Sequence, residues 1–275
     1  FDKNYVDALS SFQKVQASSR YQKIVPTYIC QIYFAKKQYQ QLIAYGQPLV
    51  DKKDLREAQQ IAQLLGQSYF ETANYTKALP YLETYVAKSN RVSKEALYQL
   101  GFTQYKVGKF DKALENFGQL NDLNNQMGQS ALYSMADCLL KTNNKSAARQ
   151  AFQKASQLDF DQDLKEDAMI NYAKLSFEQG FDSDAVLALE YFNDKSSAYY
   201  NEAQNLLAKV LINTRDYDVA LDLLRNMKTK TQTLKETHQK IAYFRGVQWY
   251  SNAAYSKAIQ LFNESINIGI HQETI

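Results

Sequence analysis

Few side chains in this sequence could do nucleophilic, acid–base or metal chemistry. The chain has two histidines, His238 and His271, and two cysteines, Cys30 and Cys138. A Ser or Cys nucleophile needs a base within hydrogen-bond reach, and neither histidine lies in a Ser, Cys or carboxylate arrangement typical of a catalytic site. We interpret both histidines as exposed polar residues at hairpin ends and Cys138 as a small packing residue. With no CxxC pair, a structural zinc site lacks a ligand set.

Other catalytic signatures are also missing from the sequence. It contains no GxGxxG, P-loop or HExxH motif, each of which places specific groups around a phosphate or a metal. The acidic pair Glu166 and Asp167 is interpreted as part of a solvated face near a helix start. The sequence therefore predicts no catalytic residue, no metal ligand and no cofactor, and a protein that is not an enzyme.

Composition and charge indicate a helical protein that does not bind nucleic acid. Only 9 Gly and 3 Pro occur in 275 residues, and 45% of the residues are apolar, whereas an all-β fold needs frequent turn residues. The net charge is +3 with acids and bases interleaved, too little basic surface to bind phosphates. The basic residues Lys228 and Lys230 are expected in a solvated loop. No apolar run approaches the ~20 residues of a membrane span.

An internal repeat is the strongest feature of the sequence. Leu65–Tyr85 and Leu100–Leu120 can be aligned on the glycine that follows their first leucine. Both then show an aromatic residue four positions on, another at nine and an alanine at twelve. The matching residues are Gly66, Phe70, Tyr75 and Ala78 in one segment, and Gly101, Tyr105, Phe110 and Ala113 in the other.

The same frame can be followed along the chain at a period of about 35 residues. Its small-residue anchors are Cys30, Gly66, Gly101, Ala136, Ala173, Ala208 and Gly246. Alanine occupies the position twelve residues after every anchor except the first. A large apolar residue occupies the position sixteen residues after, again except for the first anchor. Small residues at these positions let two helices of one hairpin approach closely, and the apolar spacing makes one helical face apolar. A partial unit in residues 1–17 precedes the first anchor.

This small–aromatic–Ala spacing resembles the tetratricopeptide repeat (TPR) family over nearly the whole chain. The resemblance implies an all-α solenoid of helical hairpins, a right-handed superhelix with about seven complete repeats and a partial N-terminal one. It predicts a single solenoid across residues 1–275, within a longer protein. Thr76 and Asp111 are expected to cap second helices. Pro26, Pro48 and Gly46 predict a local irregularity in the second unit.

First helices of successive TPR hairpins line a groove that commonly holds peptides, so the frame also predicts a binding surface. Aromatic residues in such a groove are typical interface anchors. We expect four of them to converge on the third and fourth hairpins, with two lysines at the edge. The four aromatic residues are Tyr98, Phe102, Tyr105 and Tyr133, and the lysines are Lys106 and Lys141. Phe102 is the most suggestive, because its position usually carries a polar residue. The alternative for Phe70 and Tyr105 is ordinary packing between repeats. The candidate residues are Phe70, Tyr98, Phe102, Tyr105, Lys106, Tyr133 and Lys141.

The function implied by the resemblance is a scaffold or adaptor that binds a protein or peptide partner. A second hypothesis is a regulatory or substrate-presenting TPR domain of a larger enzyme or sensor. The phrasing of the repeats is similar in style to long TPR proteins of Bacteroidetes-type cell envelopes. It favours a bacterial, periplasmic or envelope location, with the cytoplasm as the alternative.

Overall fold

The computed structural model describes residues 4–50, 58–214 and 216–270, and these residues form helices joined by short turns. They contain fifteen α-helices, one short 3-10 helix and no β-strand, which confirms the predicted all-α fold. None of the described helices is both long and apolar enough to cross a membrane. The chain divides into two compact units, Phe1–Asn144 and Lys145–Ile275, which are described separately below.

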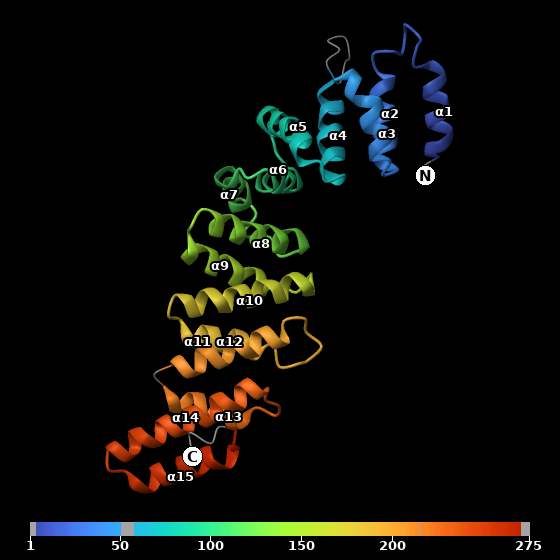
Figure 1. Ribbon diagram of the computed structural model, residues 1–275. Helices are drawn as coiled ribbons and strands as arrows, with labels where there is room; N and C mark the ends of the chain where they lie inside the picture. The colour runs from blue at the N-terminus through green and yellow to red at the C-terminus, as the bar shows by residue number, and fades with distance from the viewer. Residues whose placement is uncertain (1–3, 51–57, 215, 271–275) are drawn as a thin grey trace. The chain divides into compact units, whose positions relative to one another are not determined.

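The described residues of the N-terminal unit form eight α-helices and one 3-10 helix, and each α-helix packs on its neighbours along the chain (Figure 1). Paired helices such as α4 and α5, or α6 and α7, form antiparallel hairpins. The elements are α1 (Tyr5–Val15), α2 (Val25–Ala35), α3 (Tyr39–Gly46), η1 (Gln47–Leu49), α4 (Ala58–Glu71), α5 (Tyr75–Lys88), α6 (Lys94–Lys106), α7 (Phe110–Gly118) and α8 (Gln126–Lys141).

In the C-terminal unit, residues 145–214 and 216–270 form seven α-helices arranged in the same way. In Figure 1 they run back and forth from yellow-green to red, and α14 with α15 forms the most extensive pairing. The elements are α9 (Lys145–Ser156), α10 (Gln162–Glu178), α11 (Asp182–Glu190), α12 (Tyr200–Asn213), α13 (Tyr217–Asn226), α14 (Gln232–Ser251) and α15 (Tyr255–Ile268).

Each anchor of the sequence frame lies buried in an even-numbered helix from α2 to α14. The residue twelve positions later is buried in the following helix in every case, from Leu42 in α3 to Ala258 in α15. Glycine anchors face the large residue sixteen positions on. A Cβ on Gly101 would lie 3.1 Å from the Phe117 ring, tighter than ordinary packing allows. The frame therefore predicts correctly which residues lie where two helices meet.

A left-handed residue closes the first helix of the hairpins, seven positions after the anchor. This position has φ between 56° and 79° at each of six turns. The next residue donates its backbone N–H to the carbonyl five residues earlier, at 2.7–2.9 Å, which is the longer bond of a Schellman cap. Only two of the six residues are glycine, so the residue types at this position do not indicate that all six turns share one conformation. The residues are Lys37, Ala73, Gly108, Asn143, Gly180 and Ala253.

The predicted helix caps are wrong. α5 begins two residues earlier than a Thr76 cap would place it, and the Asn74 side chain accepts a hydrogen bond from the backbone N–H of Lys77. α7 has Lys109 at its N-cap without a side-chain bond, and Asp111 lies inside its first turn. An acidic residue there still interacts favourably with the helix dipole. Because the tight Schellman turn sets where each second helix begins, the cap falls earlier than composition suggests.

The irregularity predicted for the hairpin with the anchor Cys30 is partly confirmed. α3 is short and continues into the 3-10 helix η1, which contains Pro48. Pro26, in contrast, interrupts nothing, because it occupies the first turn of α2, where a missing N–H costs no hydrogen bond.

Candidate functional site

Helix α6 places three aromatic side chains on one face. It begins at Lys94 after Ser93, whose side chain accepts a hydrogen bond from the backbone N–H of Ala96. Tyr98, Phe102 and Tyr105 follow at spacings of four and three residues, which align side chains along a helix.

The three rings join two from the preceding hairpin in an aromatic patch, defined here as Phe70, Tyr75, Tyr98, Phe102 and Tyr105. Phe102 lies at its centre. Its ring centroid is 5.8 Å from those of Tyr75 and Tyr98, and 5.9 Å from those of Phe70 and Tyr105. Such separations are favourable for aromatic pairs. Each of the five rings is half-buried, so the patch packs between hairpins and also keeps part of its surface open.

Two phenols tie the patch to helix α8. The Tyr98 hydroxyl is 2.7 Å from Ser130 Oγ, and the Tyr105 hydroxyl donates to Asp137 Oδ2 at 2.7 Å. Burial raises the pKa of Tyr98, and burial together with Asp137 raises that of Tyr105. Both phenols therefore keep their protons: the Tyr105 hydroxyl donates to Asp137, and either oxygen of the Tyr98–Ser130 pair can be the donor.

The lysines of the candidate set lie at helix ends. The Lys106 ammonium lies 5.1 Å from the ring centroids of both Phe102 and Tyr105, within cation–π range. Its side chain is exposed and forms no ion pair with a described residue. Lys141 is exposed in the last turn of α8. Tyr133 is half-buried on α8, on the helical face that also carries Ser130 and Asp137.

The structure therefore brings Phe70, Tyr98, Phe102 and Tyr105 together, with Lys106 above two of the rings. Phe70 contacts the rings of Tyr98 and Phe102 on the next hairpin, which is the packing between repeats considered for it, whereas Tyr105 contacts Phe110 of its own hairpin. Phe102 is also part of this packing. Its ring contacts explain why an aromatic residue stands at a position that usually carries a polar one. A surface of this kind can bind apolar and anionic groups.

The interpretation of His238 as an exposed residue is wrong. The residue is 8% exposed within α14, and its Nε2 lies 2.7 Å from Glu264 Oε1 on α15. Arg225 donates two further hydrogen bonds to the Glu264 carboxylate. Burial lowers the pKa of His238 although Glu264 opposes this. The group is a buried polar network that joins three helices, and His271 lies outside the described residues.

The acidic pair on α10 is not simply solvated. Glu166 accepts a hydrogen bond from Ser197 Oγ at 2.6 Å, and Asp167 accepts one from the Tyr199 hydroxyl at 2.9 Å. Both carboxylates are half-buried. They hold the segment between α11 and α12 against α10. No local sequence pattern predicts this tertiary contact.

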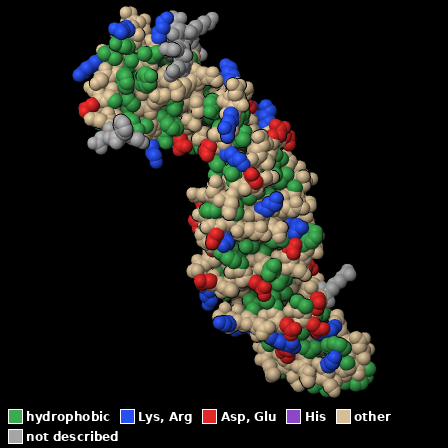
Figure 2. All heavy atoms as spheres, turned by 180° about the vertical axis from the view of Figure 1, so that it is seen from behind, with side chains coloured by type: hydrophobic (Ala, Val, Ile, Leu, Met, Phe, Trp, Pro, Cys, Tyr) green, Lys and Arg blue, Asp and Glu red, His purple; other side chains and the backbone are tan. Residues whose placement is uncertain are grey.

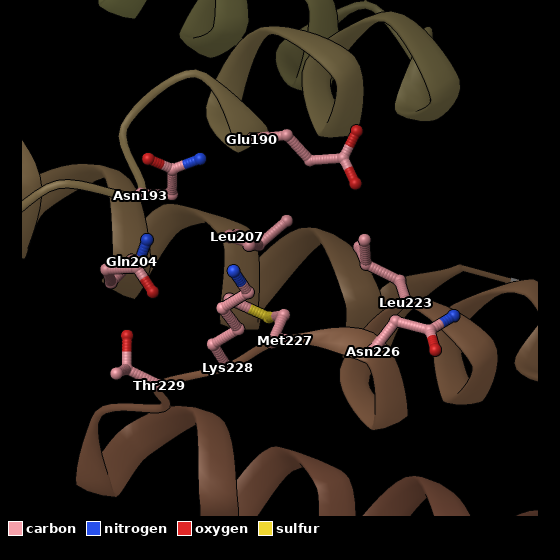
Figure 3. Close-up of a pocket in the computed structure, with 9 residues that line it drawn as sticks. All are labelled: Glu190, Asn193, Gln204, Leu207, Leu223, Asn226, Met227, Lys228 and Thr229. Carbon is pink, nitrogen blue, oxygen red and sulfur yellow. The ribbon is translucent and has the colours of Figure 1, made fainter.

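The sequence also gave no sign of a pocket in the C-terminal unit. This pocket has a volume of about 560 Å³ and lies between α11, α12 and the end of α13, with Gln204 and Leu207 in its wall (Figure 3). Lys228, expected in a solvated loop, lines it. No group of three or more His, Cys, Asp or Glu residues that could hold a metal occurs in the described ranges.

Surface charge is mixed on the face drawn in Figure 2. Basic and acidic side chains alternate there with apolar areas, and neither sign forms a continuous field in either unit.

Comparison with known proteins identifies the repeats. Residues 98–161 match the model of the tetratricopeptide repeat, and residues 35–120 match that of anaphase-promoting complex, cyclosome, subunit 3. No curated protein gives a significant match to the sequence.

Two solved structures share the fold. One is YrrB, described as a TPR protein with an unusual peptide-binding site. It is 15% identical, with a TM-score of 0.51 over 79% of this chain and 99% of YrrB. The other is the C-terminal part of a TPR repeat-containing protein from Cytophaga hutchinsonii, 14% identical. Its TM-score is 0.51 over 90% of this chain and 97% of that one. With its buried anchors, uniform hairpin turns and matching repeat model, this chain is a tetratricopeptide-repeat protein.

Proposed function

We propose that the chain is a non-catalytic protein-interaction scaffold, and that a peptide segment of a partner protein binds on the aromatic patch beside Lys106. TPR hairpins are modules that present extended surfaces to other chains. The peptide-binding site described for YrrB, a protein of similar fold, makes a peptide the natural class of ligand.

The observation that carries the proposal is the position of Lys106 over the central ring. Its ammonium lies 5.1 Å from the Phe102 centroid, is exposed, and has no carboxylate partner among the described residues. A partner segment with an apolar side chain beside an Asp or Glu matches this surface, because the rings take the apolar group and the ammonium takes the carboxylate. Half-buried aromatic rings contribute binding area at little cost in rotamer entropy.

The experiment compares partner recovery by the wild type, Lys106→Glu and Phe102→Leu in pull-downs from the source cell. Lys88→Glu is the matched control, because Lys88 is also an exposed lysine in the last turn of its helix. Both charge reversals then cost the same helix-dipole interaction, and circular dichroism checks that every variant folds.

We expect Lys106→Glu and Phe102→Leu to lose a partner that Lys88→Glu retains. Reversing one charge beside a bound carboxylate should weaken binding about tenfold or more. Retention of every partner by the folded Lys106→Glu and Phe102→Leu variants would refute binding at the aromatic patch.

A further inference from the structure

The pocket of the C-terminal unit is separate from the groove positions of its own repeat. It lies where the C-terminal ends of α11 and α13 flank α12 (Figure 3). Its volume of about 560 Å³ falls within the roughly 300–1,000 Å³ of small-ligand sites. The residues of α12 at the frame positions that Tyr98, Phe102 and Tyr105 occupy on α6 are Asn205, Lys209 and Ile212, and none of them lines it.

Gln204 gives the pocket an unsatisfied acceptor. The residue is 2% exposed, and its Nε2 donates to the carbonyl oxygen of Phe192 at 2.9 Å. A carbonyl only accepts, so this bond fixes which end of the amide faces Phe192. The other end, Oε1, is buried without a hydrogen-bond donor among the described residues. In Figure 3 this oxygen points into the pocket, toward Lys228 and Thr229.

An orphaned buried carbonyl is costly, of the order of 1–3 kcal/mol, and native proteins seldom leave one unpaired. A ligand with an N–H group placed in the pocket would satisfy it. Backbone N–H groups of an extended peptide are donors of this kind, since no intramolecular bond uses them.

The remaining wall combines an apolar part with polar groups at the rim. Leu207 is fully buried, and Leu223 and Met227 are half-buried beside it. The side chains of Asn193 and Asn226 are exposed and make no hydrogen bond to a described residue. Such a pocket accepts an apolar side chain and, around it, peptide carbonyl groups.

Charge indicates the sign of the ligand. Lys228 lines the pocket, and Lys195 and Lys230 line a second cavity of about 360 Å³ that adjoins it at Thr229. The one carboxylate in the two linings is that of Glu190. Three lysines against one glutamate favour an anionic group on the ligand.

We propose that this pocket binds a short extended peptide segment that carries a large apolar side chain and a carboxylate. The apolar side chain lies on Leu207 and Met227, a backbone N–H donates to Gln204 Oε1, and the carboxylate lies beside Lys228. The carboxylate comes either from an acidic side chain or from a peptide C-terminus. This site is independent of the aromatic patch and can hold a second segment of a partner.

Methionine-methyl NMR of the 275-residue chain can test the proposal. The chain has four methionines, and Met227 is the one in the pocket, so Met227→Leu assigns its signal. Three peptides are titrated: acetyl-Ala-Ala-Leu with a free C-terminus, its C-terminal amide, and acetyl-Ala-Glu-Leu amide. The first and third carry the two sources of carboxylate, and the second carries none.

The expected result is a shift of the Met227 methyl signal, and not of the other three, with at least one carboxylate peptide. The peptide that binds more tightly identifies the source of the carboxylate. Lys228→Ala should weaken binding about tenfold, whereas Lys235→Ala, an exposed lysine outside the lining, should leave it unchanged. Gln204→Leu, which adds no methionine signal, should also weaken binding if circular dichroism shows it folded.

Three results would overturn the proposal. The first is no Met227 shift with any of the peptides at millimolar concentration. The second is equal binding of the neutral amide, and the third is unchanged affinity in the Lys228→Ala variant.

Discussion

Gly246 on α14 is the anchor where the structure predicts the sharpest effect of adding one methyl group. A Cβ on this glycine would lie 2.7 Å from Phe262 Cε1 and 2.9 Å from Cδ1. Carbon atoms pack at roughly 3.5–4.0 Å. The Phe262 ring cannot simply move away, because Tyr243 lies against it with a centroid separation of 5.9 Å.

The size of the effect follows from two opposing contributions. Replacing a glycine inside a helix by alanine gains about 1 kcal/mol of helix propensity. Overpacking a filled contact costs about 1–3 kcal/mol. We therefore expect Gly246→Ala to lower the free energy of unfolding of the last hairpin by up to about 2 kcal/mol, against the direction that propensity predicts.

Replacing alanine by glycine seven residues later, at Ala253, should raise the stability of the hairpin. Ala253 has φ of 58° at the end of α14 and is exposed. A left-handed conformation costs an L-residue about 1–2 kcal/mol, and glycine removes this strain at some cost in unfolded-state entropy. We expect Ala253→Gly to stabilise the same hairpin by about 1 kcal/mol.

One assay reports on both variants. The single tryptophan, Trp249, lies in α14, so its fluorescence follows unfolding of this hairpin in urea. Because repeat proteins can unfold in parts, a local probe is more informative than total helicity. Asn263→Ala is the control, since Asn263 is exposed in α15 and this change should add a few tenths of a kcal/mol through propensity alone.

A Gly246→Ala protein that is more stable than the wild type would refute the close-approach explanation of the anchors. The double variant Gly246→Ala/Phe262→Leu gives a second check. It should lose less stability than the two single changes added together, because the smaller side chain leaves room for the methyl group.

Three further predictions follow from the buried polar groups. Burial lowers the pKa of His238, and hydrogen bonds from Arg225 and His238 outweigh the burial that would raise the pKa of Glu264, so both pKa values are depressed. Tryptophan fluorescence in urea should therefore show full stability above about pH 6.5 and a loss as pH falls toward the folded-state values, with a shallower loss in His238→Gln. Both cysteine thiols are buried with pKa values raised to about 12, so Ellman's reagent at pH 8 should react with them only after unfolding. Tyr105→Phe removes the 2.7 Å bond to Asp137 and should lower the thermal midpoint of the N-terminal unit, at a cost of about 1–3 kcal/mol.

The sequence predicted the helix–helix contacts well, because each contact demands a particular size of side chain. All seven anchors are buried, and a Cβ at Gly66 would meet Tyr81 at 2.9 Å. A position that excludes any larger residue leaves a pattern that repeats with the structural unit. The all-α fold and the position of the hairpin turns follow from the same pattern.

Side-chain partners between helices were not predictable in this way. His238 and Glu264 are 26 residues apart, and Glu166 and Ser197 are 31 apart. Neither distance is a multiple of the repeat, so no frame brings these residues together before the fold is known. The same applies to the Asn74 cap, which depends on where the preceding turn ends.

The pocket shows why a repeat frame is a poor guide to binding sites of this kind. The frame describes what the hairpins have in common, whereas the pocket forms where they differ. Its walls include the segment after α11, held by Glu166 and Asp167 through Ser197 and Tyr199, and the segment that follows α13. Both segments lie between repeats, where no anchor restricts the residue type. In this chain the regular positions fix the scaffold, and the inter-repeat segments are therefore where specificity for individual ligands should be sought.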